Sequence, residues 1–207
     1  ARYKEDIDWA NGLANDQTSV IIYNKSDKPC VSPHPIVPLT NVGREGHTYA
    51  YYILTHYDVL EEYTVFLQGY PFDHSPHLEQ QLCDMHDRIR HGTQPDFEYL
   101  SSQVLFSNLA RCPYDITLDM YPTYQKVFGV AGPQGHPFLF GAGAQFVVSK
   151  AAIQSRPRAF YENLCSVLDY DVHPVEGFCV ERFWHMIFTH SESSCAPRDS
   201  LETHRSR

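Results

Sequence analysis

The fold is decided by residues 41–74, which read NVGREGHTYAYYILTHYDVLEEYTVFLQGYPFDH. In this stretch a glycine-bounded polar turn precedes an amphipathic helix expected over 46–57, and a short apolar strand over 63–68 opens into a loop rich in hydrogen-bonding side chains. Ligands of open α/β sheets bind just beyond the carboxyl ends of the strands. The loop that follows residue 68 is therefore the first place to expect a binding site.

Outward from this stretch, helices and strands alternate along the chain. Further helices are expected at 5–13, 76–89, 159–168 and 177–190, and further strands at 19–23 and 145–148, with Ser149 as the N-cap of the helix that follows. Four prolines between residues 29 and 38 predict an extended connector without regular structure, and residues 92–119 read as irregular. Alternation with short links favours a mainly parallel sheet with helices on both faces.

Length and composition predict one α/β domain over residues 1–190, followed by a polar, flexible tail over 191–207. Ala1-Arg2-Tyr3 reads as the end of a strand whose apolar body is missing, so the first strand is expected to be truncated or to start upstream. No apolar run approaches the roughly 18 residues that a membrane helix requires. As numbered, the chain is expected to be soluble. Its compartment is left open, and removal of an upstream anchor would be consistent with the lumen of the secretory pathway.

The charge balance argues against one class of partner. The formal net charge is -9 and hydrophobic residues make up 43% of the chain, so we expect a globular protein without the basic surface that a nucleic acid needs. A phosphate-bearing substrate would then require a local basic pocket or a cation. The six cysteines show no Cys-x-x-Cys spacing, which argues against a zinc knuckle, and a disulfide framework is not indicated.

Glu181 is the most interesting candidate for acid–base chemistry. It lies in the helix expected over 177–190, where its neighbours are aromatic. A carboxylate held among apolar groups has a raised pKa and can act as a base. The alternative is an ion pair between Glu181 and the adjacent Arg182 or another cation, because structural ion pairs also perturb acids.

Arg44, Glu45 and His47 stand at the start of the helix expected over 46–57. Backbone amides at a helix N-terminus, with an arginine beside them, form an anion site suited to a diphosphate. The alternative is that Glu45 and His47 only cap the helix, since helix starts are polar for structural reasons.

The loop after the 63–68 strand gathers Gln68, Asp73, His74 and His77. Asp73 with His74 could coordinate a divalent cation or bind sugar hydroxyls. This loop lacks an Asp-x-Asp pair, the usual means of holding Mg²⁺ or Mn²⁺ against a diphosphate, and Mg²⁺ prefers oxygen ligands. Surface histidines without a ligand are the alternative interpretation.

Two further segments are expected to border the same site. Arg2 follows the presumed first strand and so faces the ligand edge of the sheet, although it also belongs to a run of charges that could be solvated. Glycines at 141 and 143 leave room for a ligand or another backbone to approach, just before the strand expected at 145–148.

Six blocks of sequence occur in order along the chain: ARYKED with Trp9 (1–9), IYNK (22–25), NVGREGHTY (41–49), FLQG with FDH (66–74), GAGAQF (141–146) and ERFW (181–184). Together they resemble a family that is abundant in fungi and is catalogued as a domain of unknown function, over residues 1 to about 190. That family is more distantly similar to the GT-A class of nucleotide-sugar glycosyltransferases. The resemblance implies a GT-A-like three-layer sandwich with a mostly parallel central sheet.

The resemblance also implies roles for individual residues. By this resemblance Arg2 and Lys25 would lie near the nucleotide, Gln68 on the strand that usually binds metal, and Gly143 and Gln145 at the acceptor border, with Glu181, beside Arg182, as the base. The residues themselves add Arg44, with Glu45 and His47, for the diphosphate and Asp73 with His74 for a cation or sugar contact.

The sequence therefore predicts transfer of a sugar from a nucleotide-sugar donor to a glycan or other acceptor, with Mn²⁺ or Mg²⁺ as the candidate cofactor. Two alternatives stay open. One is a non-catalytic module that binds a glycan or nucleotide, which the missing acidic pair favours. The other is a metal-dependent hydrolase built on Asp73, His74 and His77, which the clustered histidines favour.

Overall fold

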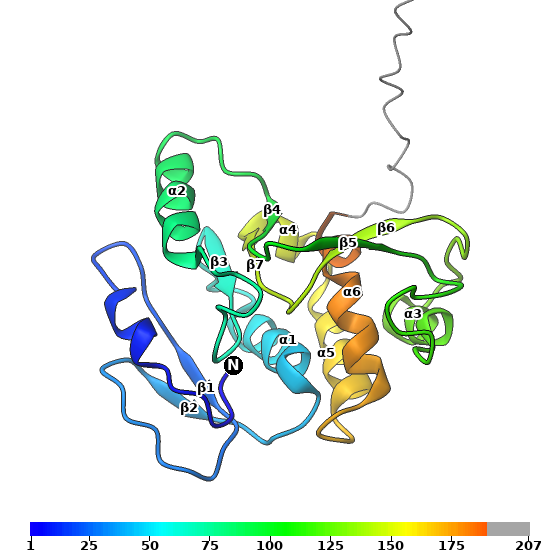
Figure 1. Ribbon diagram of the computed structural model, residues 1–207, viewed down its shortest axis with the longest axis horizontal. Coiled ribbons are helices and arrows are strands. Elements are labelled where there is room, and N and C mark those ends of the chain that lie inside the picture. Colours follow the sequence, from blue (N-terminus) through cyan, green and yellow to red (C-terminus); the bar gives the residue numbers. More distant parts are fainter. Residues whose placement is uncertain (190–207) are drawn as a thin grey trace, which may run out of the picture.

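The computed structural model describes residues 1–189, which form a mixed α/β fold of short strands and longer helices (Figure 1). The strands are β1 (Ile22–Asn24), β2 (Ile36–Pro38), β3 (Tyr63–Phe66), β4 (Phe97–Tyr99), β5 (Val104–Ser107), β6 (Phe138–Gly141) and β7 (Phe146–Ser149). The helices are the 3₁₀ helix η1 (Asp8–Gly12) and the α-helices α1 (Arg44–His56), α2 (Leu78–Arg90), α3 (Met120–Phe128), α4 (Lys150–Gln154), α5 (Arg158–Leu168) and α6 (Val175–Thr189).

The strands form small sheets that are mostly antiparallel, so the expectation of a mostly parallel central sheet is wrong. β1 pairs with β2 in parallel, whereas β7 lies between β3 and β4 and is antiparallel to both, and β5 pairs with β6 antiparallel. Since β7 opposes both neighbours, β3 and β4 run in the same direction, as is usual for two strands of one sheet that are connected through a helix. The alternation did not reveal that β7, whose four residues are all buried, would take the central place between them.

Two regions expected to be irregular contain short strands. β2 lies inside the proline-rich connector, and β4 and β5 lie within residues 92–119. Among residues 1–189, β2 pairs only with β1, and the hydrogen bonds at its two ends use the Pro35 carbonyl and the Leu39 amide, so this pairing needs no donor from a proline nitrogen. Proline is tolerated in such an edge strand, which is why the prediction failed here.

The predicted helices are present, although the one expected over 5–13 is only the short 3₁₀ helix η1. α1 begins after Gly43, which has a φ of 62°, and the side chain of Ser149 accepts a hydrogen bond from the Ala152 amide, so its predicted N-cap role is confirmed. α1, α3, α5 and α6 pack on one another, and α2 stands apart from them (Figure 1). An aromatic core joins α1 and α6 to the sheet: the Trp184 ring is 5.2 Å from Phe146 and 5.9 Å from Tyr49, between centroids.

Within residues 1–189, no helix has the length and apolar character needed to cross a membrane. The expected polar tail over 191–207 lies outside the described residues.

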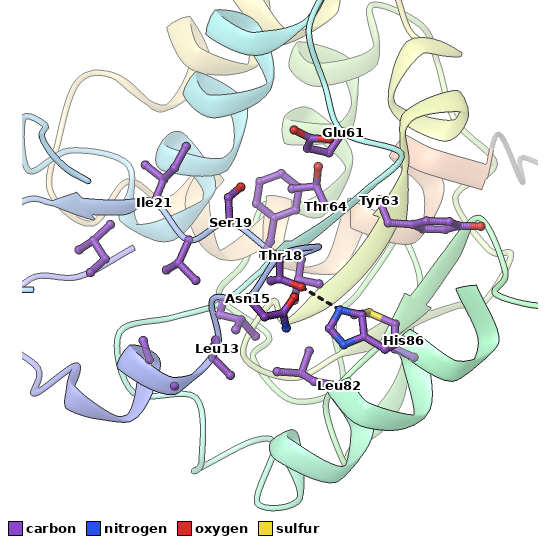
Figure 2. A pocket seen from close by; sticks show the side chains of 18 of the residues that line it. Leu13, Asn15, Thr18, Ser19, Ile21, Glu61, Tyr63, Thr64, Leu82 and His86 are labelled. Atoms are coloured by element: carbon purple, nitrogen blue, oxygen red, sulfur yellow. Dashed lines mark hydrogen bonds between the residues drawn. The ribbon is translucent and has the colours of Figure 1, made fainter. Parts of the chain in front are cut away.

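A cavity of about 1040 Å³ lies between β1 and β3 (Figure 2). Its two long walls are residues 15–23 and 61–69, and side chains of α1 and α2 complete it. Thr18 and His86 are joined at its border by a hydrogen bond of 2.9 Å between Oγ1 and Nε2.

Candidate functional site

The candidate residues gather where strands end. Lys25 directly follows β1, Gln68 lies two residues beyond β3, and Gln145 directly precedes the oppositely directed β7. Arg2 forms a parallel bridge with Asn24, the last residue of β1. Through this bridge and a hydrogen bond of 2.8 Å from the Ala1 nitrogen to the Leu67 carbonyl, the N-terminus connects the ends of β1 and β3, which are far apart in sequence.

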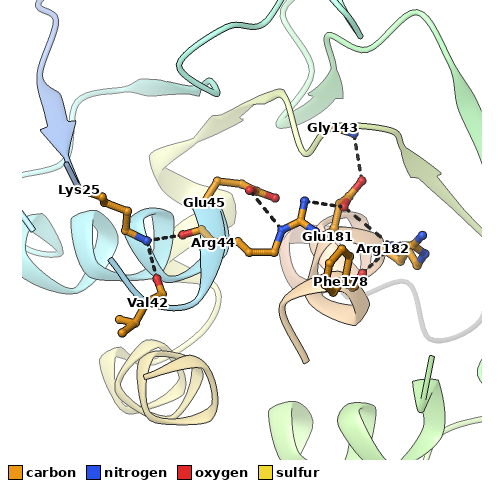
Figure 3. A network of polar contacts seen from close by, with 8 residues as sticks. All are labelled: Lys25, Val42, Arg44, Glu45, Gly143, Phe178, Glu181 and Arg182. Carbon is orange, nitrogen blue, oxygen red and sulfur yellow. Dashed lines mark hydrogen bonds and ion pairs between the residues drawn. The ribbon is translucent and has the colours of Figure 1, made fainter. Parts of the chain in front are cut away.

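Glu181 is the centre of this group (Figure 3). Its Oε1 accepts a hydrogen bond of 3.0 Å from the Gly143 amide, which joins α6 to the turn between β6 and β7. Its Oε2 forms ion pairs with Arg44 Nη2 at 3.9 Å and with Arg182 Nη1 at 3.8 Å. These two distances are too long for hydrogen bonds, so Oε2 keeps lone pairs with which to accept a proton.

Burial raises the pKa of Glu181, and the nearby negative charge of Glu45 raises it further. The Gly143 hydrogen bond and the two arginines oppose this shift because they stabilise the carboxylate. The side chain is only 12% exposed. The arrangement combines both sequence interpretations, since Glu181 is an ion-paired acid and also an acid with a raised pKa.

Arg44 is held in an unusual position at the start of α1. Its φ is 52°, which is uncommon for a residue with a side chain, and its guanidinium lies over the Phe178 ring at 3.9 Å from the centroid. Its Nε is 3.7 Å from a carboxylate oxygen of Glu45. The packing on Phe178 orients the charge of α1 toward Glu181 on α6.

Lys25 is buried, and its ammonium donates to the carbonyl oxygens of Val42 and Arg44 (Figure 3). Burial lowers the pKa of this amine to about 8, although the charge of Glu45 acts in the opposite direction. Lys25 thus links the end of β1 to the backbone at the start of α1. In this geometry it positions Arg44, and its expected contact with a diphosphate stays a prediction.

His47 lies one turn into α1 and is also buried. Its amide donates to the Gly43 carbonyl, and its Nδ1 has no hydrogen-bond partner within residues 1–189. Burial lowers the pKa of the imidazole, and the positive charge of Lys25 lowers it further, so the ring is neutral at physiological pH. A neutral ring can accept or donate one hydrogen bond but contributes no charge to an anion site.

The loop after β3 folds back onto this centre. Gln145 donates to the Pro71 carbonyl at 2.9 Å, and the His74 carbonyl accepts from the Ser102 amide at 2.7 Å. His74 packs so closely on Gly143 that a side-chain carbon at that glycine would lie 2.3 Å from the imidazole. His74 is thereby brought beside the residue that holds Glu181.

Metal ligands are sparse in this loop. Asp73 and His77 are exposed, and His74 is half-buried against Gly143. Across the part of the chain that the structure describes, no three His, Cys, Asp or Glu side chains are close enough to hold a metal ion. Asp73 and His74 could therefore offer a cation two ligands, and the remaining ligands would have to come from substrate or water.

Arg2 and Gln68 occupy the border of the site. Arg2 and Gln68 are both half-buried. The guanidinium of Arg2 donates to the Asn24 side chain at 2.6 Å and to the Glu5 carbonyl at 2.9 Å. A side-chain carbon at Gly69, next to Gln68, would lie 2.6 Å from the Glu5 carboxylate and 3.1 Å from the Ala1 carbonyl, and the Gly69 carbonyl accepts from the Trp9 indole. These contacts fix the backbone around both residues.

Sequence reasoning missed two residues of the site. Tyr49 is 2% exposed, its hydroxyl has no partner within the described chain, and burial followed by the charges of Glu45 and Glu181 raises its pKa well above 10.0. Phe178 is the platform for Arg44. Helical spacing is the signal that could have found them, because Tyr49 lies four residues after Glu45 and Phe178 three before Glu181.

Comparison with known proteins and protein families gives one match. No curated protein and no solved structure matches the chain significantly. One family matches residues 1–202, nearly the whole length. The chain belongs to this family, which is described as "Protein of unknown function (DUF3431)".

Proposed function

We propose that this protein transfers a sugar from a nucleotide-sugar donor to an acceptor hydroxyl, with Glu181 as the general base and Arg44 as a diphosphate contact. One observation carries the proposal. A mostly buried carboxylate with a raised pKa stands between two guanidinium groups, at the edge where the candidate strands end. The Glu181 carboxylate, a candidate base, and the Arg44 guanidinium, a cation that can bind an anion, therefore lie close together.

The chemistry needs these two kinds of group together. As the acceptor oxygen bonds to the anomeric carbon, its proton passes to Glu181 and the bond from that carbon to the diphosphate oxygen breaks. The electron pair of this bond leaves with the diphosphate, whose charge Arg44 can stabilise. Because Arg44 rests on Phe178, its charge is already oriented.

A GT-A-like arrangement of the sheet is part of the proposal. The directions of the strands support it: β3 and β4 run the same way, β1 and β2 are parallel, and β7 is reversed between β3 and β4. The sequence blocks that resemble the family supply Lys25, Arg44, Gly143 and Glu181. The donor, the acceptor and any use of Mn²⁺ or Mg²⁺ at Asp73 and His74 belong to the same proposal.

The proposal is tested first by binding. A thermal-shift screen of nucleotide sugars, run with and without Mn²⁺, should find a donor that raises the melting temperature, because a ligand that binds only the folded state stabilises it. The metal-free series separates binding by the protein's own residues from binding that needs a cation.

Turnover is then tested with the donor found. Glu181→Gln should lower the rate of transfer by about 10²- to 10⁴-fold, since the amide cannot accept the proton, while its oxygen still accepts from the Gly143 amide. An equal rate in the variant would refute the role of Glu181. Donor binding with no product in the wild type would instead support the non-catalytic binding module, and release of the sugar to water only with metal would support the hydrolase.

A further inference from the structure

A second cleft lies at the start of α2, beside the loop that follows β3. Its volume is about 510 Å³, within the range of small-ligand sites. The residues that line it are Phe72, Pro76, His77, Glu79, Gln80 and Cys83. Glu79 and Cys83 also border the larger cavity between β1 and β3. The loop and the first turns of α2 therefore form this cleft together.

Phe72 offers a fixed aromatic ring to the cleft. The centroid of this ring is 5.4 Å from that of Trp9 and 5.4 Å from that of Tyr70, and the ring planes meet at 80° and 71°. The Trp9 indole is itself held by the Gly69 carbonyl at 3.0 Å. Because these contacts orient the ring in advance, little conformational freedom is lost when a ligand binds to it.

The backbone that carries Phe72 is also anchored. The Pro71 carbonyl accepts hydrogen bonds from the His74 and Ser75 amides, which closes a turn, and from the Gln145 side chain at 2.9 Å. The His74 carbonyl accepts a further bond from the Ser102 amide. The loop and the start of α2 thus present one preformed surface.

Hydrogen-bonding groups without a protein partner line the same cleft. Within residues 1–189, the Glu79 carboxylate and the His77 ring make no hydrogen bond or ion pair. The Gln80 side chain donates to Asp84 at 2.8 Å, which leaves its carbonyl oxygen free to accept. Neither lysine nor arginine is among the six lining residues, so the cleft does not suit a phosphate or another anion.

An aromatic ring beside hydrogen-bond acceptors suits a sugar. The C–H groups on one face of a pyranose are apolar and slightly positive, and they pack on the negative face of an aromatic ring. The sugar hydroxyls donate to carboxylate and amide oxygens, which Glu79 and Gln80 offer. A neutral glycan therefore matches both the apolar and the polar part of the cleft.

The same loop connects the cleft to the candidate site. His74 is two residues from Phe72, so their Cα atoms are at most about 7 Å apart. His74 packs on Gly143, whose amide holds the Glu181 carboxylate. Phe72 is thus one short loop away from the segment that holds the candidate base, a separation that a chain of a few sugars can span.

We propose that this cleft binds one sugar unit of a neutral glycan, with Phe72 as the stacking surface and Glu79 and Gln80 as partners of its hydroxyls. The glycan is the acceptor of the transfer reaction, and this role rests on the proposed function. Sugar binding itself needs no transfer, so the two claims can be tested separately.

Cys83 allows a test on the unmodified protein. Its thiol is exposed and lines the cleft, whereas Cys30 is partly exposed and lies outside it. Neutral trisaccharides of glucose, mannose and N-acetylglucosamine are titrated by calorimetry, and alkylation of each cysteine by a maleimide is followed by peptide mass spectrometry. At ten times its Kd, a bound trisaccharide should slow alkylation of Cys83 about tenfold and that of Cys30 not at all, because only about one molecule in eleven keeps a free cleft.

Three outcomes of this experiment would overturn the proposal. The first is that none of the trisaccharides protects Cys83, and the second is that both cysteines are protected equally. The third is protection of Cys83 by tetramethylammonium in place of the sugars, since an aromatic ring beside a carboxylate could also hold a cation.

A change at Phe72 locates the binding. Phe72→Leu keeps an apolar side chain beside Trp9 and Tyr70 but removes the flat ring, so it should weaken trisaccharide binding by at least about tenfold. Tyr114→Leu removes an aromatic ring that is exposed outside the cleft and should bind as wild type does. Equal affinities in the two variants would contradict the role of Phe72.

A second pair of variants does not touch the aromatic cluster. Gln80→Ala, at an exposed position of α2, should bind the trisaccharide about two- to tenfold more weakly, which is the usual net effect of one lost hydrogen bond. Gln125→Ala, at an exposed position of α3, is the matched control and should leave binding unchanged. Unchanged binding in Gln80→Ala would contradict its contact with the sugar.

Failure of the sugar site and failure of the proposed function look different. Trisaccharide binding that depends on Phe72, with no transfer from any nucleotide sugar, would support the sugar site and contradict the transferase. Transfer to a trisaccharide with the same acceptor KM in Phe72→Leu as in wild type would support the transferase and overturn the cleft as its acceptor site.

Discussion

At the scale of single residues, Gly143 couples three parts of the site. Its amide holds Glu181, its φ of 82° turns the chain between β6 and β7, and the His74 ring fills the space where a side chain would be. This one residue explains why the glycine-rich block and the histidine of the loop after β3 belong to the same arrangement.

Gly143→Ala should therefore destabilise the protein strongly. Gly129→Ala is a matched control, because Gly129 also has a positive φ, of 71°, but has nothing within 4 Å of an added carbon. Both changes carry the left-handed backbone cost of about 1 kcal/mol. The clash with His74 should add about 1–3 kcal/mol at Gly143, measured by urea denaturation. Equal losses in the two variants would contradict the close contact.

The raised pKa of Glu181 predicts how stability depends on pH. The pKa of this acid is higher in the folded state than its unfolded value of about 4.5. At a pH between the two pKa values the folded protein therefore binds more protons than the unfolded chain, so the free energy of unfolding decreases as the pH rises through this interval. Glu181→Gln removes this loss. The difference in unfolding free energy between variant and wild type should thus shift in favour of Glu181→Gln from pH 4 upward, measured by urea denaturation at a series of pH values. A difference that does not change with pH would contradict the raised pKa.

At the scale of helices and strands, Ser149 connects β7 to α4. Its hydroxyl accepts from the Ala152 amide at 3.0 Å and donates to Asp96 at 2.6 Å. Ser149→Ala should cost about 1 kcal/mol or more in unfolding free energy, since the first turn of α4 loses its cap. Ser166→Ala, at an exposed position in the last turn of α5, is the control and should leave stability unchanged or slightly raise it. Equal effects would contradict the capping role.

The helices were the easier elements to predict. α1, α2, α5 and α6 show apolar residues at helical spacing with recognisable ends, and these are local signals. The central position of β7 was not predictable in this way, because it depends on pairing with β3 and β4, more than 45 residues earlier in the chain. The proline-rich β2 was missed because an edge strand needs few donors of its own.

The sequence indicated which residues belong to the candidate site better than it indicated how those residues contact one another. Glu181 and Arg44 could be chosen from composition and position, and the structure brings them within 3.9 Å. That Lys25 would donate to the backbone at the start of α1 has no sequence signal, because the lysine and its carbonyl partners meet only in the folded chain. Phe178 and Tyr49 looked like ordinary core residues.

At the scale of the whole molecule, the polar blocks converge although their sequence separation is large. Arg44 reaches Glu181, Glu181 reaches Gly143, and Gly143 packs on His74, so four segments between residues 44 and 181 form one connected group. The account depends on this group recognising the diphosphate of a nucleotide sugar. Arg44 is the charge best placed to do so, since Lys25 is occupied by carbonyl oxygens.

Calorimetric titration with a nucleoside diphosphate tests this claim most directly. Arg44→Met keeps an apolar side chain to rest on Phe178 but removes the charge, and Arg111→Met, at an exposed position, is the control. The account predicts that Arg44→Met binds at least about tenfold more weakly than wild type, a loss of about 1.4 kcal/mol, and that Arg111→Met binds as wild type does. No binding by the wild type, or equal affinity in all three proteins, would contradict it.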